Sequence, residues 1–206
     1  MKKILFQGDS ITDACRIREA DWSKGFGYPN LVSAELGVDF PNDYECFNKG
    51  IAGNRIVDLY ARIKEEAINL KPDIMSILVG VNDVWAELQY GGGTDTAKFE
   101  KIYNMMIEEI KTALPDVKLM ILEPFLLHGV ETDKIWDEFR AGVEEKAAAV
   151  KRVAEAHNIK FIPLMKKFDE AAEIAPPSHW SGDGVHPSES GHELIKREWM
   201  KAFKEL

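Results

Sequence analysis

Residues 3–12 read KILFQGDSIT, a short apolar run followed by a glycine, an aspartate and a serine. The segment from Lys3 to Gln7 has the length and composition of a buried strand, and Gly8 breaks it. A serine in this place has two interpretations. Ser10 caps the helix that follows, which is the commoner role, or it is a nucleophile.

The same arrangement recurs along the chain. Four further apolar runs have the length of a strand: residues 45–48, 73–79, 117–122 and 160–163. Parallel strands need crossover connections, and they bury both faces of their sheet. Five such strands, each separated from the next by a longer segment, therefore predict a parallel sheet.

The segments between the strands have the apolar period of helices. The clearest are residues 56–70, closed by Pro72, residues 99–113, closed by Pro115, and residues 134–157. A last helix follows Ser190 and Glu193, which have the spacing of a capping box. We therefore predict an α/β fold, a three-layer α/β/α sandwich. Residues 87–96, with three consecutive glycines, are expected to form a loop.

Composition and charge narrow the class of protein. The 206 residues are 45% hydrophobic and 30% charged, which is typical of a globular protein with a sizeable core. No repeat, low-complexity tract or linker divides the chain, so we expect one domain over residues 1–206. The net charge of −9 argues against a nucleic-acid partner, because phosphate binding needs clustered Lys and Arg.

Location and cysteine chemistry follow from simple counts. The N-terminal MKKILFQGD lacks the apolar core of a secretory signal, and no run of 18 apolar residues occurs. We therefore expect a cytoplasmic protein with no membrane partner. Cys15 and Cys46 form no CxxC pair and are expected to be reduced structural thiols.

Small and hydrogen-bonding residues follow the first three predicted strands. They are Gly8-Asp9-Ser10, the stretch from Asn48 to Arg55, and Gly80-Val81-Asn82-Asp83. Ligands of open parallel sheets bind beyond the carboxyl ends of the strands, so these three segments can converge. Each alone is more often a turn or a helix cap.

A fourth segment changes this interpretation. Asp183 lies three residues before His186 in DGVHP, a stretch too rich in Gly and Pro to be a regular strand. A turn there brings both side chains together, as an orienting carboxylate and a general base require. His186 alone is more often a surface histidine. One Asp–His pair without further spaced ligands makes a poor metal site, so we expect no metal and no cofactor.

These four segments resemble the motif blocks of the SGNH hydrolases, also called the GDSL family. The blocks appear in order as GDSI (8–11), GIAGNR (50–55), GVND (80–83) and DGVHP (183–187), and the resemblance runs from about residue 3 to residue 199. Ile11 replaces the leucine of the family name, a conservative change. The stretches NKGIAGNRIVDLYARI and GVNDVW look most like bacterial acetylxylan esterases and related carbohydrate acetylesterases.

The resemblance implies a fold and a set of roles. The fold would be flavodoxin-like with a five-stranded parallel sheet. Ser10 would be the nucleophile, His186 the base and Asp183 its orienter. The oxyanion hole would consist of the backbone N–H groups of Ser10 and Gly53 and the side-chain amide of Asn82. Members of the subgroup often associate, which is compatible with a homo-oligomer.

Supporting residues have two interpretations each. Asp9 bonds backbone near Ser10 or is an ordinary loop acid, and Arg55 braces the Gly53 loop or faces solvent. Trp85 and Trp180 form an aromatic wall for substrate or belong to the core. Phe26 and Tyr28 are assigned to the first long helix and its packing.

The expected substrate is a small-molecule ester. No apolar amphipathic lid is present, which favours short-chain esters, and the subgroup resemblance implies acetyl groups on sugars or xylo-oligosaccharides. A lysophospholipase or thioesterase activity remains an alternative, because the catalytic set does not encode the leaving group. A different class, a non-catalytic flavodoxin-like ligand-binding module, would give Asp183 and His186 no role.

Overall fold

The computed structural model describes residues 1–206 and contains one five-stranded sheet. The strand order is β2-β1-β3-β4-β5, and every neighbouring pair is parallel. The strands are β1 (Lys2–Gly8), β2 (Tyr44–Asn48), β3 (Ile74–Leu78), β4 (Lys118–Leu122) and β5 (Lys160–Ile162). Each begins and ends within two residues of the segment predicted from its apolar run.

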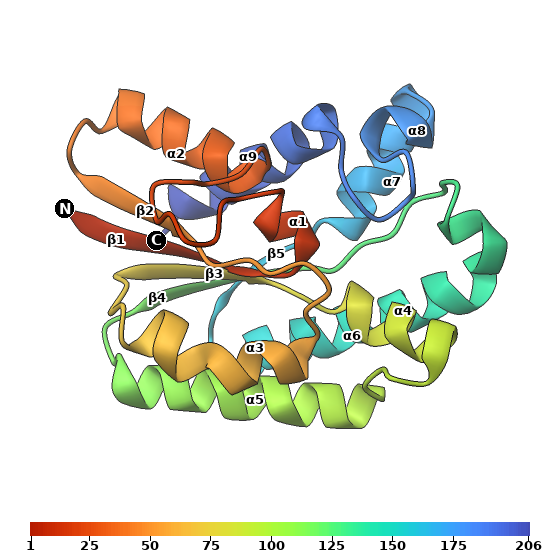
Figure 1. Ribbon diagram of the computed structural model, residues 1–206, viewed down its shortest axis with the longest axis horizontal. Helices are drawn as coiled ribbons and strands as arrows, with labels where there is room; N and C mark the ends of the chain where they lie inside the picture. The colour runs from red at the N-terminus through yellow and green to blue at the C-terminus, as the bar shows by residue number, and fades with distance from the viewer.

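Helices cover both faces of this sheet, which confirms the three-layer prediction (Figure 1). On one face lie α2 (Tyr28–Asp39) and α9 (Glu189–Phe203), and on the other α3 (Ile56–Ile63), α5 (Thr96–Ala113) and α6 (Trp136–Ala156). Ile4 packs in one core and Leu5 in the other, and both are fully buried. The alternation of a strand thus divides the apolar residues of β1 between two cores.

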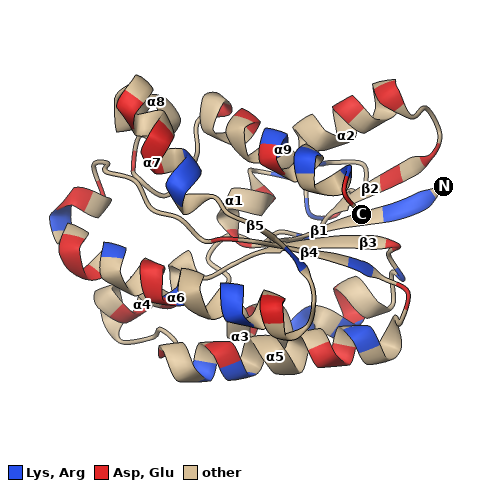
Figure 2. Cartoon of the chain, turned by 180° about the vertical axis from the view of Figure 1, so that it is seen from behind, with Lys and Arg blue, Asp and Glu red and all other residues tan.

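The remaining elements are short. They are α1 (Ser10–Asp13), α4 (Val81–Tyr90), α7 (Met165–Ile174), α8 (Pro177–Trp180), a π-helical turn at Lys64–Ile68 and a 3₁₀ turn at Thr132–Ile135. Lys, Arg, Asp and Glu lie mostly on the outward sides of the helices (Figure 2). None of the helices is both long and apolar enough to cross a membrane.

Several local predictions were wrong. Ser188, not Ser190, caps α9, because its hydroxyl accepts a hydrogen bond from the N–H of Gly191. The segment 56–70 is not one α-helix, since α3 passes into the π-helical turn. Residues 87–90 continue α4, which shortens the predicted loop.

Phe26 also differs from its prediction. It precedes α2 rather than packing within it, and its side chain is 79% exposed, whereas Tyr28 begins that helix and is buried as expected.

The strand order determines where the site lies. β1 lies between β2 and β3, and the chain crosses to β2 on one face of the sheet and to β3 on the other. Such a reversal leaves a crevice at the carboxyl ends of the central strands.

Candidate active site

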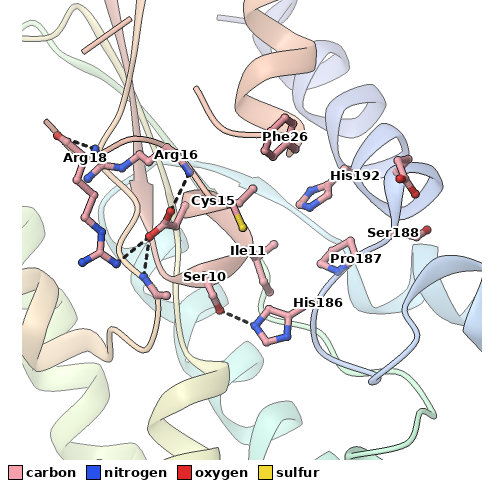
Figure 3. Close-up of a pocket in the computed structure, with 14 residues that line it drawn as sticks. Ser10, Ile11, Cys15, Arg16, Arg18, Phe26, His186, Pro187, Ser188 and His192 are labelled. Atoms are coloured by element: carbon pink, nitrogen blue, oxygen red, sulfur yellow. Dashed lines mark hydrogen bonds and ion pairs between the residues drawn. The ribbon is translucent and has the colours of Figure 1, made fainter. Parts of the chain in front are cut away.

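Ser10, His186 and Asp183 form a continuous chain of hydrogen bonds at this crevice. The Oγ of Ser10 lies 2.8 Å from Nε2 of His186, and Nδ1 of that ring lies 2.6 Å from Oδ2 of Asp183. Figure 3 shows the serine and the histidine facing one another across 176 residues of sequence. The predicted residues are therefore brought together.

The N-cap interpretation of Ser10 was wrong. Asp9 is the N-cap of α1, since its Oδ1 accepts the N–H of Ile11 at 3.0 Å, and Ser10 is the first residue of the helix. The hydroxyl of Ser10 is therefore free to bond His186. The interpretation of Asp9 as a carboxylate that bonds backbone near Ser10 is confirmed.

Asp183 and His186 stabilise each other's charged forms. Burial alone would raise the pKa of Asp183, but hydrogen bonds from the ring and backbone of His186 and from the N–H of Val185 lower it well below its ordinary value. The bond to Asp183 in turn raises the pKa of His186, against the opposing effect of its burial. With Nδ1–H donated to Asp183, Nε2 can accept the serine proton.

A segment that the sequence did not single out supports this turn. The carbonyl of Asp183 accepts the N–H groups of Glu131 and Thr132 at 3.2 and 3.3 Å, and the carbonyl of Gly184 accepts that of Leu127 at 2.9 Å. Gly184 has φ +93°, a conformation that favours glycine. Residues 127–132 thus fix the backbone that carries Asp183 and His186.

The predicted oxyanion donors, Ser10, Gly53 and Asn82, lie close to one another. Gly53 has φ +82°, and a Cβ there would meet open space. The side-chain amide of Asn82 donates one hydrogen to the carbonyl of Asn54 at 3.1 Å, and its second hydrogen remains for another acceptor. Ser10, Gly53 and Asn82 line one cavity of about 350 Å³, here called the Asn82 cavity.

Asp83 and Arg55 make hydrogen bonds that fix the loop carrying Gly53. Asp83 is fully buried, and both its oxygens accept the N–H of Ile56, at 3.3 and 3.1 Å. Burial raises its pKa to about 7. Arg55 bonds Asp58 at 3.0 Å and the carbonyl of Gly92. Arg55 therefore does brace the loop, by tying it to the glycine stretch at 91–93.

Asp9 is another buried acid of the site. It is 1% exposed, and its Oδ2 has no hydrogen-bond partner. Burial raises its pKa to about 7, although the bond from Ile11 and the nearby His186 oppose this. Two carboxyl groups with raised pKa values thus adjoin proposed site residues in sequence, Asp9 beside Ser10 and Asp83 beside Asn82, and perturbed pKa values are common at active sites.

A second, larger cavity of about 650 Å³ is also lined by Ser10 and His186 (Figure 3). We call it the Phe26 cavity, and its walls include Phe26, Cys15, Arg18 and His192. Burial lowers the pKa of His192 to about 4. Cys15 is free and exposed here, whereas Cys46 is free and buried. None of these wall residues was assigned to the site from sequence.

Trp85 and Trp180, both predicted as possible substrate contacts, have different surroundings. Trp85 lines the Asn82 cavity, with its ring centre 6.3 Å from that of His186. Trp180 lines neither cavity, and its indole N–H donates to the carbonyl of Ala171 at 3.0 Å in α7. Trp180 thus has a packing role. No group of three or more His, Cys, Asp or Glu side chains is arranged to hold a metal ion.

Comparison with known proteins agrees with this geometry. The family model of the GDSL-like lipase/acylhydrolase family matches residues 6–194. An acetylxylan esterase of Geobacillus stearothermophilus is 33% identical over 214 residues, which cover 97% of this chain and 93% of the relative.

Solved structures give the same result. A Parabacteroides merdae protein assigned as a GDSL-like lipase superimposes with a TM-score of 0.89 at 34% identity, covering 98% of this chain and 94% of the other. Axe2, an acetylxylan esterase from Geobacillus stearothermophilus, gives 0.87 at 31% identity, with 98% and 93% covered. The chain belongs to the GDSL-like lipase/acylhydrolase family and is a carboxylic ester hydrolase.

Proposed function

We propose that this hydrolase removes short acyl groups, chiefly acetyl groups, from sugars or xylo-oligosaccharides through an acyl-enzyme on Ser10. The observation that carries the proposal is the chain of hydrogen bonds from Ser10 through His186 to Asp183. The similarity to acetylxylan esterases supports the acetyl-sugar substrate.

Acylation begins at the serine hydroxyl. Oγ of Ser10 attacks the ester carbonyl carbon while Nε2 of His186, 2.8 Å away, takes its proton. Asp183 stabilises the imidazolium that forms, because it accepts the Nδ1–H at 2.6 Å. The developing oxyanion lies against the backbone N–H groups of Ser10 and Gly53 and the free hydrogen of Asn82. His186 then protonates the leaving alcohol.

Deacylation repeats these steps with water. Water occupies the place of the departed alcohol, and His186 removes its proton as it attacks the acyl carbonyl. The same three donors hold the second oxyanion. Collapse of this intermediate breaks the bond to Oγ, and His186 returns its proton to Ser10.

The two cavities suit the two arms of an ester. Ser10 and His186 line both, whereas Gly53 and Asn82 line only the smaller one. With the carbonyl oxygen directed at these donors, the acyl group lies in the Asn82 cavity beside Trp85. The alcohol arm occupies the Phe26 cavity, whose exposed aromatic ring offers a flat apolar surface to a sugar.

The test is hydrolysis of p-nitrophenyl acetate, butyrate and octanoate, followed by acetate release from acetylated xylo-oligosaccharides. We expect acetate to be fastest and Ser10→Ala to lose several orders of magnitude in rate. Ser178→Ala, an exposed serine in α8, is the matched control and should retain full activity.

Two other outcomes would redirect the proposal. A preference for octanoate would favour a lysophospholipase or thioesterase type of activity. Equal rates for wild type and Ser10→Ala would exclude Ser10 as the nucleophile.

Asn82→Ala tests the oxyanion hole. The substitution should lower kcat by about 100- to 1000-fold, and near-full activity would show that Asn82 is not an oxyanion donor.

A further inference from the structure

Arg62 lies in α3, outside all four motif blocks, and its side chain is only 13% exposed. A guanidinium so deeply placed must donate most of its hydrogens to protein acceptors. Its four acceptors lie at the end of β1, in the loop after β2 and in the π-helical turn that follows α3. The nature of these segments indicates what the residue does.

The first contacts are with the strand ends. Nη2 donates to the carbonyl of Gly8 at 3.2 Å, and Nη1 donates to the carbonyl of Lys49 at 2.7 Å. Gly8 is the last residue of β1, two positions before Ser10. Its carbonyl also accepts the N–H of Ile51 at 3.1 Å. Arg62 therefore fixes the backbone from which the nucleophile projects.

The next contact reaches the oxyanion loop. Nε of Arg62 donates to Oδ1 of Asn54 at 2.8 Å. Asn54 follows Gly53, and its own carbonyl accepts the amide of Asn82 at 3.1 Å. One guanidinium is thus connected to the backbone before Ser10, to the residue after Gly53 and, through Asn54, to Asn82. Ser10, Gly53 and Asn82 are the three proposed oxyanion donors.

Glu66 completes the arrangement. Nη1 of Arg62 bonds its carboxylate, which is 25% exposed and lies in the π-helical turn at residues 64–68. Such turns occur often at functional sites. The planar fork of arginine contacts several acceptors at fixed angles, whereas the single ammonium of lysine cannot match them all.

We propose that Arg62 is a positioning residue that holds the three oxyanion donors in register. It touches no substrate and acts only through Gly8, Asn54 and Asn82. The inference rests on the proposed acyl transfer at Ser10. A displacement of even 1 Å in such donors is costly, because their hydrogen bonds form fully only in the transition state.

The test uses Arg62→Met and Arg62→Lys in the full chain with p-nitrophenyl acetate. We expect Arg62→Met to lower kcat on the order of 10- to 100-fold, with KM changed by less than about 3-fold, because ground-state binding is spared. Arg62→Lys should recover part of the loss. Arg152→Met removes an arginine–glutamate pair between α6 and α5 and should leave kcat unchanged.

A double-mutant cycle with Asn82→Ala separates positioning from general destabilisation. Because Arg62 acts partly through Asn82, the double variant should lose less than the product of the two single losses. A multiplicative result, or a loss in KM alone, would overturn the inference. So would a kcat loss that the lowered melting temperature fully explains.

One further variant, Asn54→Ala, and the earlier Ser10→Ala result keep the test decisive. If Arg62→Met fails to fold, Asn54→Ala removes only the acceptor of Nε, and it should lower kcat and couple to Asn82→Ala in the same way. An unaltered kcat in Asn54→Ala would then refute the inference. An active Ser10→Ala refutes the proposed function, whereas an inactive Ser10→Ala beside a fully active Arg62→Met refutes only the role of Arg62.

Discussion

Asp183 accepts four hydrogen bonds from three residues, which are His186 through its ring and its backbone N–H, Val185 through its N–H and Ser181 through its hydroxyl. These bonds keep the carboxylate ionised and orient the imidazole at once. A neutral His186 is needed to accept the proton of Ser10. Because the pair raises the pKa of His186, the rate of hydrolysis should rise with pH through a midpoint above 6.5.

Asp183→Asn tests this coupling. Asparagine keeps the size of the side chain but removes its charge, so the pKa of His186 should fall and the rising limb of kcat/KM should move to lower pH. The plateau should drop by about 1000- to 10,000-fold, because the histidine loses both orientation and stabilisation of its charged form. The measurement is kcat/KM for p-nitrophenyl acetate from pH 4 to 9. An unmoved limb would show that Asp183 does not control His186.

Asp9 makes a separate prediction about stability. Its pKa is about 7 in the folded chain and 3.8 when it is freely exposed. Between these pH values the folded chain retains a proton that the unfolded chain has lost. The stability that this proton contributes is fully present below pH 3.8 and is lost as pH rises through 7.

Asp9→Asn avoids this loss. Its amide oxygen can still accept the N–H of Ile11, and it carries no charge to bury. The variant should equal wild type near pH 4 and exceed it above pH 7 by on the order of 1 to 4 kcal/mol in unfolding free energy. Urea denaturation at both pH values measures this. Asp83 titrates in the same window and contributes to the raised pKa of Asp9, so the measured difference includes the loss of the repulsion between the two carboxylates.

The segment 127–132 controls the Asp183–His186 turn at the level of the backbone. Gly129 packs directly against this turn, and a Cβ there would lie 2.2 Å from the nitrogen of Gly184. Gly129→Ala should therefore displace the turn, lowering stability by about 1 to 3 kcal/mol, and it should lower kcat as well. Thermal unfolding and p-nitrophenyl acetate kinetics check both effects.

Gly37→Ala provides the matched control. Gly37 lies near the end of α2, and a Cβ there meets nothing within 4 Å. The substitution should stabilise the chain by about 0.5 to 1 kcal/mol and leave kcat unchanged. A loss of activity in both variants would mean that the kinetics respond to any alanine substitution, not to the contact with Gly184.

Elements with a periodic signal could be predicted from the sequence, and those held by isolated long-range bonds could not. The five strands and the motif segments at their ends follow from apolar runs punctuated by glycine. The bonds from Glu131 and Thr132 to Asp183 join residues about fifty positions apart and leave no periodic trace. Ser188 and Ser190 are equally good caps by composition, and only the tertiary path of the chain selects Ser188.

The same distinction holds for the whole site. Ser10, Asp183 and His186 could be found because each lies in a short motif. Arg62 and Phe26 could not, because an arginine on a helix and an aromatic residue near a helix start usually indicate surface and core. Their roles depend on which strand ends the sheet order places together, and the order β2-β1-β3 is a property of the entire fold.

That the chain forms a single cooperative domain is still a prediction, and Ile4 and Leu5 can test it. These neighbours in β1 are both fully buried, and they point into different cores on opposite faces of the sheet. Ile4→Ala and Leu5→Ala should each lower the unfolding free energy by about 2 to 5 kcal/mol.

If β1 unites the two cores, each variant should still unfold in one transition, with near- and far-ultraviolet circular dichroism coinciding along the urea curve. Every probe should then report the shifted midpoint, including probes of the core that the substitution does not touch. Tyr103 packs only in the core of Leu5, whereas Trp199 packs in that of Ile4. A variant that shifts the absorbance or fluorescence change of one and not of the other would show that the two cores unfold separately.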